Sequence, residues 1–254
     1  LVVQALHDDD GHFTFAYFAA LDAFRYRLAF ANSLELSALS ATTSVAAGGL
    51  IAFALASPGV PRPFRAAATS FAAVATNFAG VPLAFSFIAT LGALGMATKA
   101  MARAGFDLYA HGFSLYSISG LVLVYGYFQV PLMAIVIAPA IDGLRSTWRE
   151  AAANLGASGL QFWRLVGLPM LAPSLLSAWI LLFGSAFSAY ATAYALTAGN
   201  IALVTTEIAS VLSGNVVSAP QIGAALSIGM IAAMTATLVL SGRLAARAAR
   251  WSAR

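Results

Sequence analysis

The sequence has no cysteine, a single lysine and few charged residues of either sign. The absence of cysteine excludes disulfide bonds, thiol catalysis, iron–sulfur clusters and cysteine-ligated zinc. Charged residues are 9% of the chain, whereas a typical soluble domain has about 25%. Hydrophobic residues are 61% and the mean hydropathy is +0.86. So few charges cannot cover the surface of a water-soluble globule of 254 residues, so the composition indicates an integral membrane protein.

Five long apolar stretches make up most of the chain. They run over residues 34–57, 66–98, 113–141, 174–198 and 222–242. None has a charge in its interior, and Glu35 lies at the edge of the first. About 20 helical residues cross the hydrocarbon core of a bilayer, whereas barrel strands would alternate apolar and polar residues over about 10 positions. The sequence therefore predicts an all-α fold, a polytopic transmembrane bundle of five spans that forms one domain over residues 1–254.

The lysine and arginine residues predict the orientation of these spans. Nine of the thirteen fall on one side if the connecting segments alternate across the membrane, and the side richer in basic residues should be cytoplasmic. Residues 142–173 and the basic tail 243–254 are then cytoplasmic, and the C-terminus lies inside. Residues 1–33 and 199–221 are external, and the second of these, with Glu207 and Asn215, is a candidate contact surface for an external partner. The net charge of +4 thus reflects orientation, and no nucleic-acid partner is expected.

The segment between the third and fourth spans carries the most informative pattern. Residues 149–156 read Arg-Glu-Ala-Ala-Ala-Asn-Leu-Gly, and residues 166–169 read Val-Gly-Leu-Pro. Apolar residues recur at helical spacing before the glycine, at Leu144, Trp148, Ala151 and Leu155. We expect one amphipathic helix, a tight turn at Gly156, and a second short helix that Pro169 and Pro173 end. Two short helices at a bend form a knob that fits a groove of a partner protein.

This pattern resembles the EAA signature of the inner-membrane permease subunits of binding-protein-dependent ABC importers. That signature is Glu-Ala-Ala, three residues, Gly, nine residues, Ile, one residue, Leu-Pro, and only its Ile differs here, as Val166. The resemblance implies the type I ABC importer permease fold, with the segment docked into a cleft of a cytoplasmic ATPase. The expected ATPase-coupling residues are Arg149, Glu150, Ala151, Ala152, Gly156, Arg164, Leu168 and Pro169.

The resemblance also implies a set of partners. These are a dimer of cytoplasmic ABC ATPases that binds ATP and Mg, a second permease of different sequence and an external substrate-binding protein, in the lipid of a bacterial inner membrane. The chain has no Gly-x-x-x-x-Gly-Lys-Ser/Thr motif, so ATP hydrolysis through a P-loop falls to a separate subunit. We expect no catalytic residue, no bound cofactor and no metal in this chain. Many family members have six spans, so we also expect their first span to be absent or truncated here, with residues 1–6 as its outer end.

The substrate is predicted from a second resemblance. Residues 125–133, Tyr-Gly-Tyr-Phe-Gln-Val-Pro-Leu-Met, and residues 139–144, Pro-Ala-Ile-Asp-Gly-Leu, are similar to permeases of the spermidine/putrescine group. We therefore expect a polyamine; related branches import aminoethylphosphonate, ferric iron, thiamine, sulfate or molybdate. Polar residues inside the apolar stretches are the candidates for the translocation pathway: Asn77, Tyr125, Tyr127, Gln129, Ser188 and Tyr190, with Ser185 and Thr192 beside them. The alternative for each is hydrogen bonding between helices or anchoring at the membrane interface.

The sequence fits two other protein classes less well, and two further residue groups have alternative interpretations. An ion-coupled carrier or channel commonly has buried ionisable groups near the midplane, and a membrane-embedded enzyme needs clustered catalytic groups; the apolar stretches contain neither. Glu35 is either a contact for a cationic substrate or a carboxylate that complements a helix dipole. Residues 7–12, His-Asp-Asp-Asp-Gly-His, fail the ligand spacing of an EF-hand, so we expect a solvated acidic loop.

Overall fold

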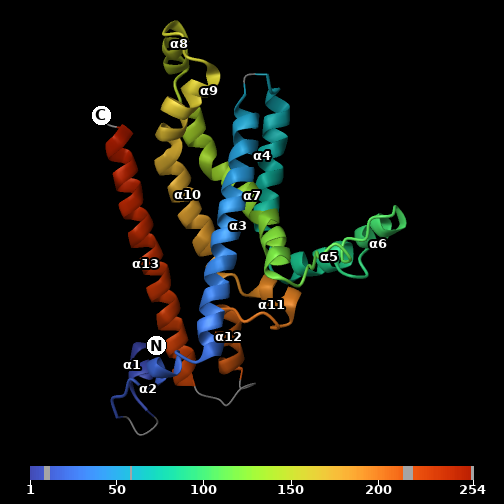
Figure 1. The fold of residues 1–254 in the computed structure, drawn as a ribbon, viewed down its shortest axis with the longest axis vertical. Coiled ribbons are helices and arrows are strands. Elements are labelled where there is room, and N and C mark those ends of the chain that lie inside the picture. Colours follow the sequence, from blue (N-terminus) through green and yellow to red (C-terminus); the bar gives the residue numbers. More distant parts are fainter. Residues whose placement is uncertain (9–11, 58, 214–219, 253–254) are drawn as a thin grey trace. The chain divides into compact units, whose positions relative to one another are not determined.

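The computed structural model describes residues 1–8, 12–57, 59–213 and 220–252, and its regular elements are helices (Figure 1). In chain order these are α1 (Val2–Leu6), α2 (Ala16–Ala20), α3 (Phe24–Ala56), α4 (Arg62–Asn77), α5 (Val81–Leu91), α6 (Met96–Arg103), α7 (Ile118–Asp142), α8 (Ser146–Asn154), α9 (Gly159–Phe162), the π-helix η1 (Trp163–Gly167), α10 (Leu168–Ser188), α11 (Ala191–Thr197), α12 (Val204–Leu212) and α13 (Pro220–Ser252).

Five helical segments are long and apolar enough to cross a membrane, as the sequence predicts. They are Phe24–Ala56, Val81–Arg103, Ile118–Asp142, Gly159–Ser188 and Pro220–Arg243. The all-α, polytopic prediction is thus confirmed. The largest differences from the predicted bounds are in the first, second and fourth spans.

The first span begins ten residues earlier than predicted, because α3 starts at Phe24. Arg25 and Arg27 lower the local hydropathy there, but arginine is a good helix former, so the helix continues through both. Glu35 is therefore the twelfth residue of α3. Since the helix dipole acts only on the first turn, the explanation of Glu35 as a dipole-complementing residue is wrong.

The predicted continuous run over residues 66–98 is interrupted, and that expectation is wrong. α4 ends at Asn77, and Gly80 has φ 77° and ψ −150°, a conformation that is essentially restricted to glycine. Pro82 lies in the first turn of α5, where its missing N–H costs no hydrogen bond. The chain therefore leaves one helix and enters another within an uninterrupted apolar sequence.

The fourth run also differs at both ends. α10 begins at Leu168 and follows η1 without a gap, with Pro169 in its first turn and Pro173 inside the helix. The predicted stop at these two prolines is therefore wrong: the helix runs from η1 through both of them to Ser188. A proline inside a helix removes one backbone hydrogen bond and can kink the helix without ending it. At the other end α10 stops at Ser188, before α11 begins at Ala191.

The chain forms two compact units. The first consists of Leu1–Ser40, Phe78–Tyr125 and Gly184–Ala236, and the second of Ala41–Asn77, Gly126–Phe183 and Thr237–Arg254. In the first unit, the start of α3 is joined to the segment around α12. The amide of Asn32 donates to the carbonyl of Ala202 at 3.0 Å, and the N–H of Val204 donates to Ser33 Oγ at 2.9 Å.

These contacts change the interpretation of the 199–221 segment as a partner surface. Glu207 lies in α12 with only 5% of its surface exposed, and its carboxylate forms an ion pair with Arg25. Glu207 therefore forms an internal contact of the first unit and is not available to an external partner. Asn215 lies outside the described residues.

In the second unit α3 and α7 approach closely. A Cβ atom built on Gly48 would lie 2.5 Å from the carbonyl oxygen of Val130 and 2.6 Å from Cβ of Met133. Nearby, Ser44 Oγ donates to Gln129 Oε1 at 3.3 Å, and Gln129 Nε2 donates to the carbonyl of Leu182 in α10 at 2.9 Å. Segments far apart in the sequence thus meet around α7.

Candidate functional site

The segment with the recognisable pattern begins with α8 and a glycine turn, as predicted. Gly156 has φ 79°, a left-handed conformation that glycine adopts without steric cost. The N–H of Ala157 donates to the carbonyl of Ala152, and the N–H of Gly156 to that of Ala153, both at 2.9 Å. This pair of bonds is the Schellman motif, which satisfies the last carbonyls of a helix. The turn ends α8 sharply and redirects the chain.

The second part of the segment starts at a capping box. The N–H of Gln161 donates to Ser158 Oγ at 3.3 Å, and the N–H of Ser158 donates to Gln161 Oε1 at 2.7 Å. This pair fixes the start of α9, which continues directly into η1 and then α10. One helical rod, Gly159–Ser188, thus joins the segment to a membrane span. A π-helical turn of this kind often marks a functional site.

Trp163 anchors the junction. Its ring meets Phe53 of α3 edge to face, with ring centroids 4.8 Å apart, and Phe162 with centroids 5.7 Å apart. A Cβ atom on Gly167 would lie 2.5 Å from the Trp163 ring, so only glycine leaves room for the indole at that position. The beginning of the rod is therefore held against the end of α3.

The predicted coupling residues lie mainly on the outside of this segment. Arg149, Glu150, Ala151, Gly156, Arg164, Leu168 and Pro169 are exposed, and Ala152 is half-buried. Leu155, Leu160 and Leu165 are 89%, 80% and 70% exposed. Trp148 is half-buried with the guanidinium of Arg145 5.9 Å from its ring centroid, so the predicted apolar face of α8 is only partly covered. Exposed leucines beside charged residues have the chemistry of a protein-docking surface.

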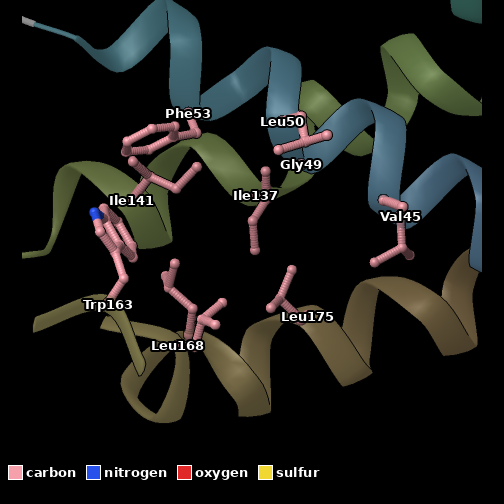
Figure 2. Close-up of a pocket in the computed structure, with 11 residues that line it drawn as sticks. Val45, Gly49, Leu50, Phe53, Ile137, Ile141, Trp163, Leu168 and Leu175 are labelled. Atoms are coloured by element: carbon pink, nitrogen blue, oxygen red, sulfur yellow. The ribbon is translucent and has the colours of Figure 1, made fainter. Parts of the chain in front are cut away.

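An apolar cavity of about 480 Å³ adjoins this junction within the second unit (Figure 2). Its walls come from α3, α7, η1 and α10. The lining residues are Val45, Ala46, Gly49, Leu50, Phe53, Ile137, Ile141, Trp163, Leu168, Leu171 and Leu175. The cavity was not predicted; the spacing of Val45, Gly49 and Phe53 along α3 places them on one face, but an apolar face alone does not reveal a void.

The pathway candidates fall into two groups. Tyr125 and Gln129 are fully buried; the Tyr125 hydroxyl donates to the carbonyl of Ala189 at 3.2 Å, and Gln129 makes the two bonds given above. Gln129 therefore links helices, and Tyr125 bonds to the residue that follows α10; a role of either residue in the pathway stays a prediction.

The other four candidates are exposed. Asn77 donates to the carbonyl of Ala73 and Ser188 to that of Gly184, one turn earlier in the same helix. Tyr127 and Tyr190 are 36% and 37% exposed, and the Tyr190 ring stacks on that of Tyr194. Asn77, Tyr127 and Gln129 belong to the second unit, and Tyr125, Ser188 and Tyr190 belong to the first.

Within the described residues, no group of three histidine, aspartate or glutamate side chains is placed to hold a metal ion. Residues 9–11 of the histidine–aspartate cluster lie outside those residues. His7 contacts the ring of Phe13 edge to face, and its Nδ1 lies 3.0 Å from the carbonyl oxygen of Val3.

Comparison with known proteins gives partial sequence matches and a full-length fold match. No family model matches the chain. The thiamine transport system permease protein ThiP of Salmonella typhimurium strain LT2 is 28% identical over 132 residues, which are 52% of this chain and 24% of that protein. The sulfate transport system permease protein CysT of the same strain is 32% identical over 97 residues, which are 38% of this chain and 34% of that protein. The matches thus span about a quarter to a third of the length of these relatives.

Two solved structures share the fold over nearly the whole chain. One is a bacterial ABC transporter involved in the import of alginate, with a TM-score of 0.74 and 18% identity over 97% of this chain and 87% of that chain. The other is a bacterial alginate ABC transporter in complex with a periplasmic protein that holds an alginate pentasaccharide, with a TM-score of 0.73 and 17% identity over 92% and 83%. With five apolar spanning helices and permease relatives, the chain is a multi-pass membrane protein with the type I ABC importer permease fold.

Proposed function

We propose that this chain is the permease subunit of an ATP-driven ABC importer and that it forms part of the translocation pathway for a small solute. One observation carries the proposal. The 146–167 segment presents its charged residues and leucines on the outside, and it continues without a break into a membrane span. A partner that binds this segment and moves it can therefore move the span directly.

The mechanism assigns separate parts to separate chains. An ABC ATPase dimer binds and hydrolyses ATP with Mg, and its closure pushes on α8 and the Gly156 turn. The rod Gly159–Ser188 transmits that push, and the Trp163–Phe53 contact passes it to α3. The spans then alternate between outward and inward access. In this scheme the chain itself carries out no covalent chemistry.

The remaining partners and the orientation belong to the same proposal. A second, different permease completes the pathway, and an external binding protein delivers the solute in the inner membrane of a bacterium. The excess of basic residues on one side supports a cytoplasmic position of the 142–173 segment and the C-terminus. The permease relatives and the fold shared with an ABC transporter bound to a periplasmic protein support this arrangement.

For the substrate, we propose a cation, and a polyamine is the cation that the 125–144 sequence favours. The supporting structural observation is Glu35, an exposed carboxylate twelve residues into a spanning helix. Charged side chains within spanning helices are rare, and they commonly mark a pathway for a substrate or an ion. The named relatives transport thiamine and sulfate, so uptake of putrescine, spermidine, thiamine and sulfate must be compared side by side. Glu35→Gln should reduce uptake of the cations; if only sulfate is transported, the cation proposal fails.

Two glycines three residues apart give a matched test of coupling. Gly156 needs its left-handed conformation, whereas Gly159 lies in the first turn of α9 with nothing within 4 Å of an added Cβ. We expect Gly156→Pro and Glu150→Lys to abolish ATP-driven uptake in reconstituted vesicles while the protein still inserts. Gly159→Ala should keep uptake near that of the native chain.

Co-purification shows whether a loss of uptake comes from a loss of ATPase binding. The native chain, extracted in mild detergent, should retain a P-loop ATPase and a second permease, and Glu150→Lys should lose the ATPase first. Unchanged uptake in both coupling variants would remove the coupling role. Transport by this chain alone in liposomes, without an ATPase, would instead establish the ion-coupled carrier or channel.

A further inference from the structure

The apolar cavity beside Trp163 lies at one end of the spans. Phe53 is three residues before the end of α3, and Ile141 is one residue before the end of α7. None of its eleven lining residues is charged, and the indole N–H of Trp163 is their one polar side-chain group (Figure 2). Apolar cavities exclude water and take up apolar molecules. A volume of about 480 Å³ is within the range of small-molecule sites.

We propose that this cavity binds an acyl chain of an anionic phospholipid from the adjacent leaflet. A multi-pass membrane protein is surrounded by acyl chains, the one apolar ligand present at high concentration. Tryptophan is enriched at the boundary between acyl chains and headgroups, and Trp163 lies where the cavity meets the chain outside the spans. Binding of the acyl chain depends only on membrane insertion, and the choice of headgroup rests in addition on the cytoplasmic orientation proposed above; neither depends on the importer function.

Basic residues that follow the spans in the chain favour an anionic headgroup. Arg62 starts the helix after α3, Arg145 precedes α8, and Arg164 follows Trp163, and all three are exposed. Basic residues next to a span attract anionic lipids of the cytoplasmic leaflet. An acyl chain in the cavity would contact Phe53, Trp163 and Leu168 together, so its presence stiffens the junction between the outer segment and α3.

Gly49 allows the cavity to be filled without disturbing its walls. It lines the cavity, and an added Cβ would have nothing within 4 Å. Gly49→Leu should therefore occupy the space of the lipid chain. The matched control is Gly242→Leu in α13, where an added Cβ also meets nothing within 4 Å and which is not among the lining residues.

The test is photolabelling of the full chain in nanodiscs with phosphatidylglycerol that carries a diazirine on one acyl chain. Label should appear on peptides that contain Ile137, Ile141 and residues 163–175. In Gly49→Leu it should fall about ten-fold, as expected if about two buried methylene groups are displaced; Gly242→Leu should label like the native chain. Equal labelling of Gly49→Leu and the native chain overturns the proposal. Absence of label in the native chain also overturns it, since the cavity is then empty or filled by a neighbouring helix.

Two further measurements complete the test. A phosphatidylcholine probe of the same chain length should label these peptides less, and equal labelling overturns the headgroup selection. Lipids brominated on the acyl chain should quench the fluorescence of Trp163, obtained as the difference between the native protein and Trp163→Phe. This second readout needs no cavity-filling variant, and an unquenched Trp163 contradicts the proposal even if Gly49→Leu does not fold.

Discussion

Arg25 Nε lies 2.7 Å from Glu207 Oε2, and the two side chains differ greatly in exposure. The arginine is 51% exposed and the glutamate 6%. The pair joins the first turn of α3 to α12, near the Asn32–Ala202 and Ser33–Val204 hydrogen bonds. The pair therefore links α3 to α12 within the first unit. Because the carboxylate is buried, it needs the arginine to compensate its charge, whereas water can solvate the arginine.

This difference in exposure predicts unequal effects of removing either member. Arg25→Gln leaves a buried carboxylate without its cation and should destabilise the protein by about 1–3 kcal/mol. Glu207→Gln leaves an arginine that water can solvate and should cost less than about 1 kcal/mol. Thermal unfolding midpoints in detergent measure both. An equal loss in the two variants, or a larger loss in Glu207→Gln, would show that the carboxylate is not the dependent member.

Neighbouring glycines in α3 give the second prediction. Gly48 faces Val130 and Met133 at distances that leave no room for a Cβ, whereas Gly49 faces open space. Gly48→Ala should therefore separate α3 from α7 and cost about 1–3 kcal/mol. Gly49→Ala should be neutral or slightly stabilising, because alanine is the better helix former. Thermal unfolding and protease resistance of the two variants should differ in that order; similar values would contradict the close approach of α3 to α7.

The sequence predicts the elements of this fold better than their interruptions. Hydropathy located all five spans, since about 20 apolar residues in a row leave few alternatives. It does not predict the breaks at Gly80, between Leu91 and Met96, and after Ser188, because a break in an apolar run depends on single glycines or on tertiary contacts and not on composition. It also predicts the end of a helix at Pro169, where the structure continues from η1 into α10.

The same distinction holds for the candidate site. The turn at Gly156 was predicted because glycine after a short helix has a specific backbone role. The burial of Tyr125 and Gln129 was not predicted, since a polar residue in a span has the same sequence signature whether it faces a pathway or a neighbouring helix. The cavity beside Trp163 depends on how three helices pack, which no local pattern specifies.

Gln129 provides the third prediction, because its two possible roles have different consequences. As a residue that joins helices, it links Ser44 of α3 to Leu182 of α10. Gln129→Leu should then lower the free energy of unfolding by about 0.6–1.7 kcal/mol. Ser44→Ala should destabilise the Gln129→Leu variant less than it destabilises the native protein. Uptake by the folded fraction should keep its KM. A changed KM with unchanged stability would restore Gln129 to the pathway.

The break between α4 and α5 provides the fourth prediction. The N–H of Gly80 donates to Thr192 Oγ1 of α11 at 2.9 Å, and Thr192 is 3% exposed. Thr192→Val keeps the shape but removes the acceptor, so the N–H loses its partner, at a cost of about 1–2 kcal/mol. Thr192→Ser retains the hydroxyl and should lose less stability than Thr192→Val.

Gly80 itself separates the contribution of that hydrogen bond from that of the backbone conformation. A Cβ at Gly80 would meet its nearest neighbours at 3.9 and 4.0 Å, ordinary contact distances. Any destabilisation of Gly80→Ala must therefore come from the φ of 77°, which should cost about 1–3 kcal/mol. Thermal unfolding of Thr192→Val, Gly80→Ala and the double variant tests this assignment. If Gly80→Ala is as stable as the native protein, the chain does not need a glycine to turn between α4 and α5, and the break depends on Thr192 instead.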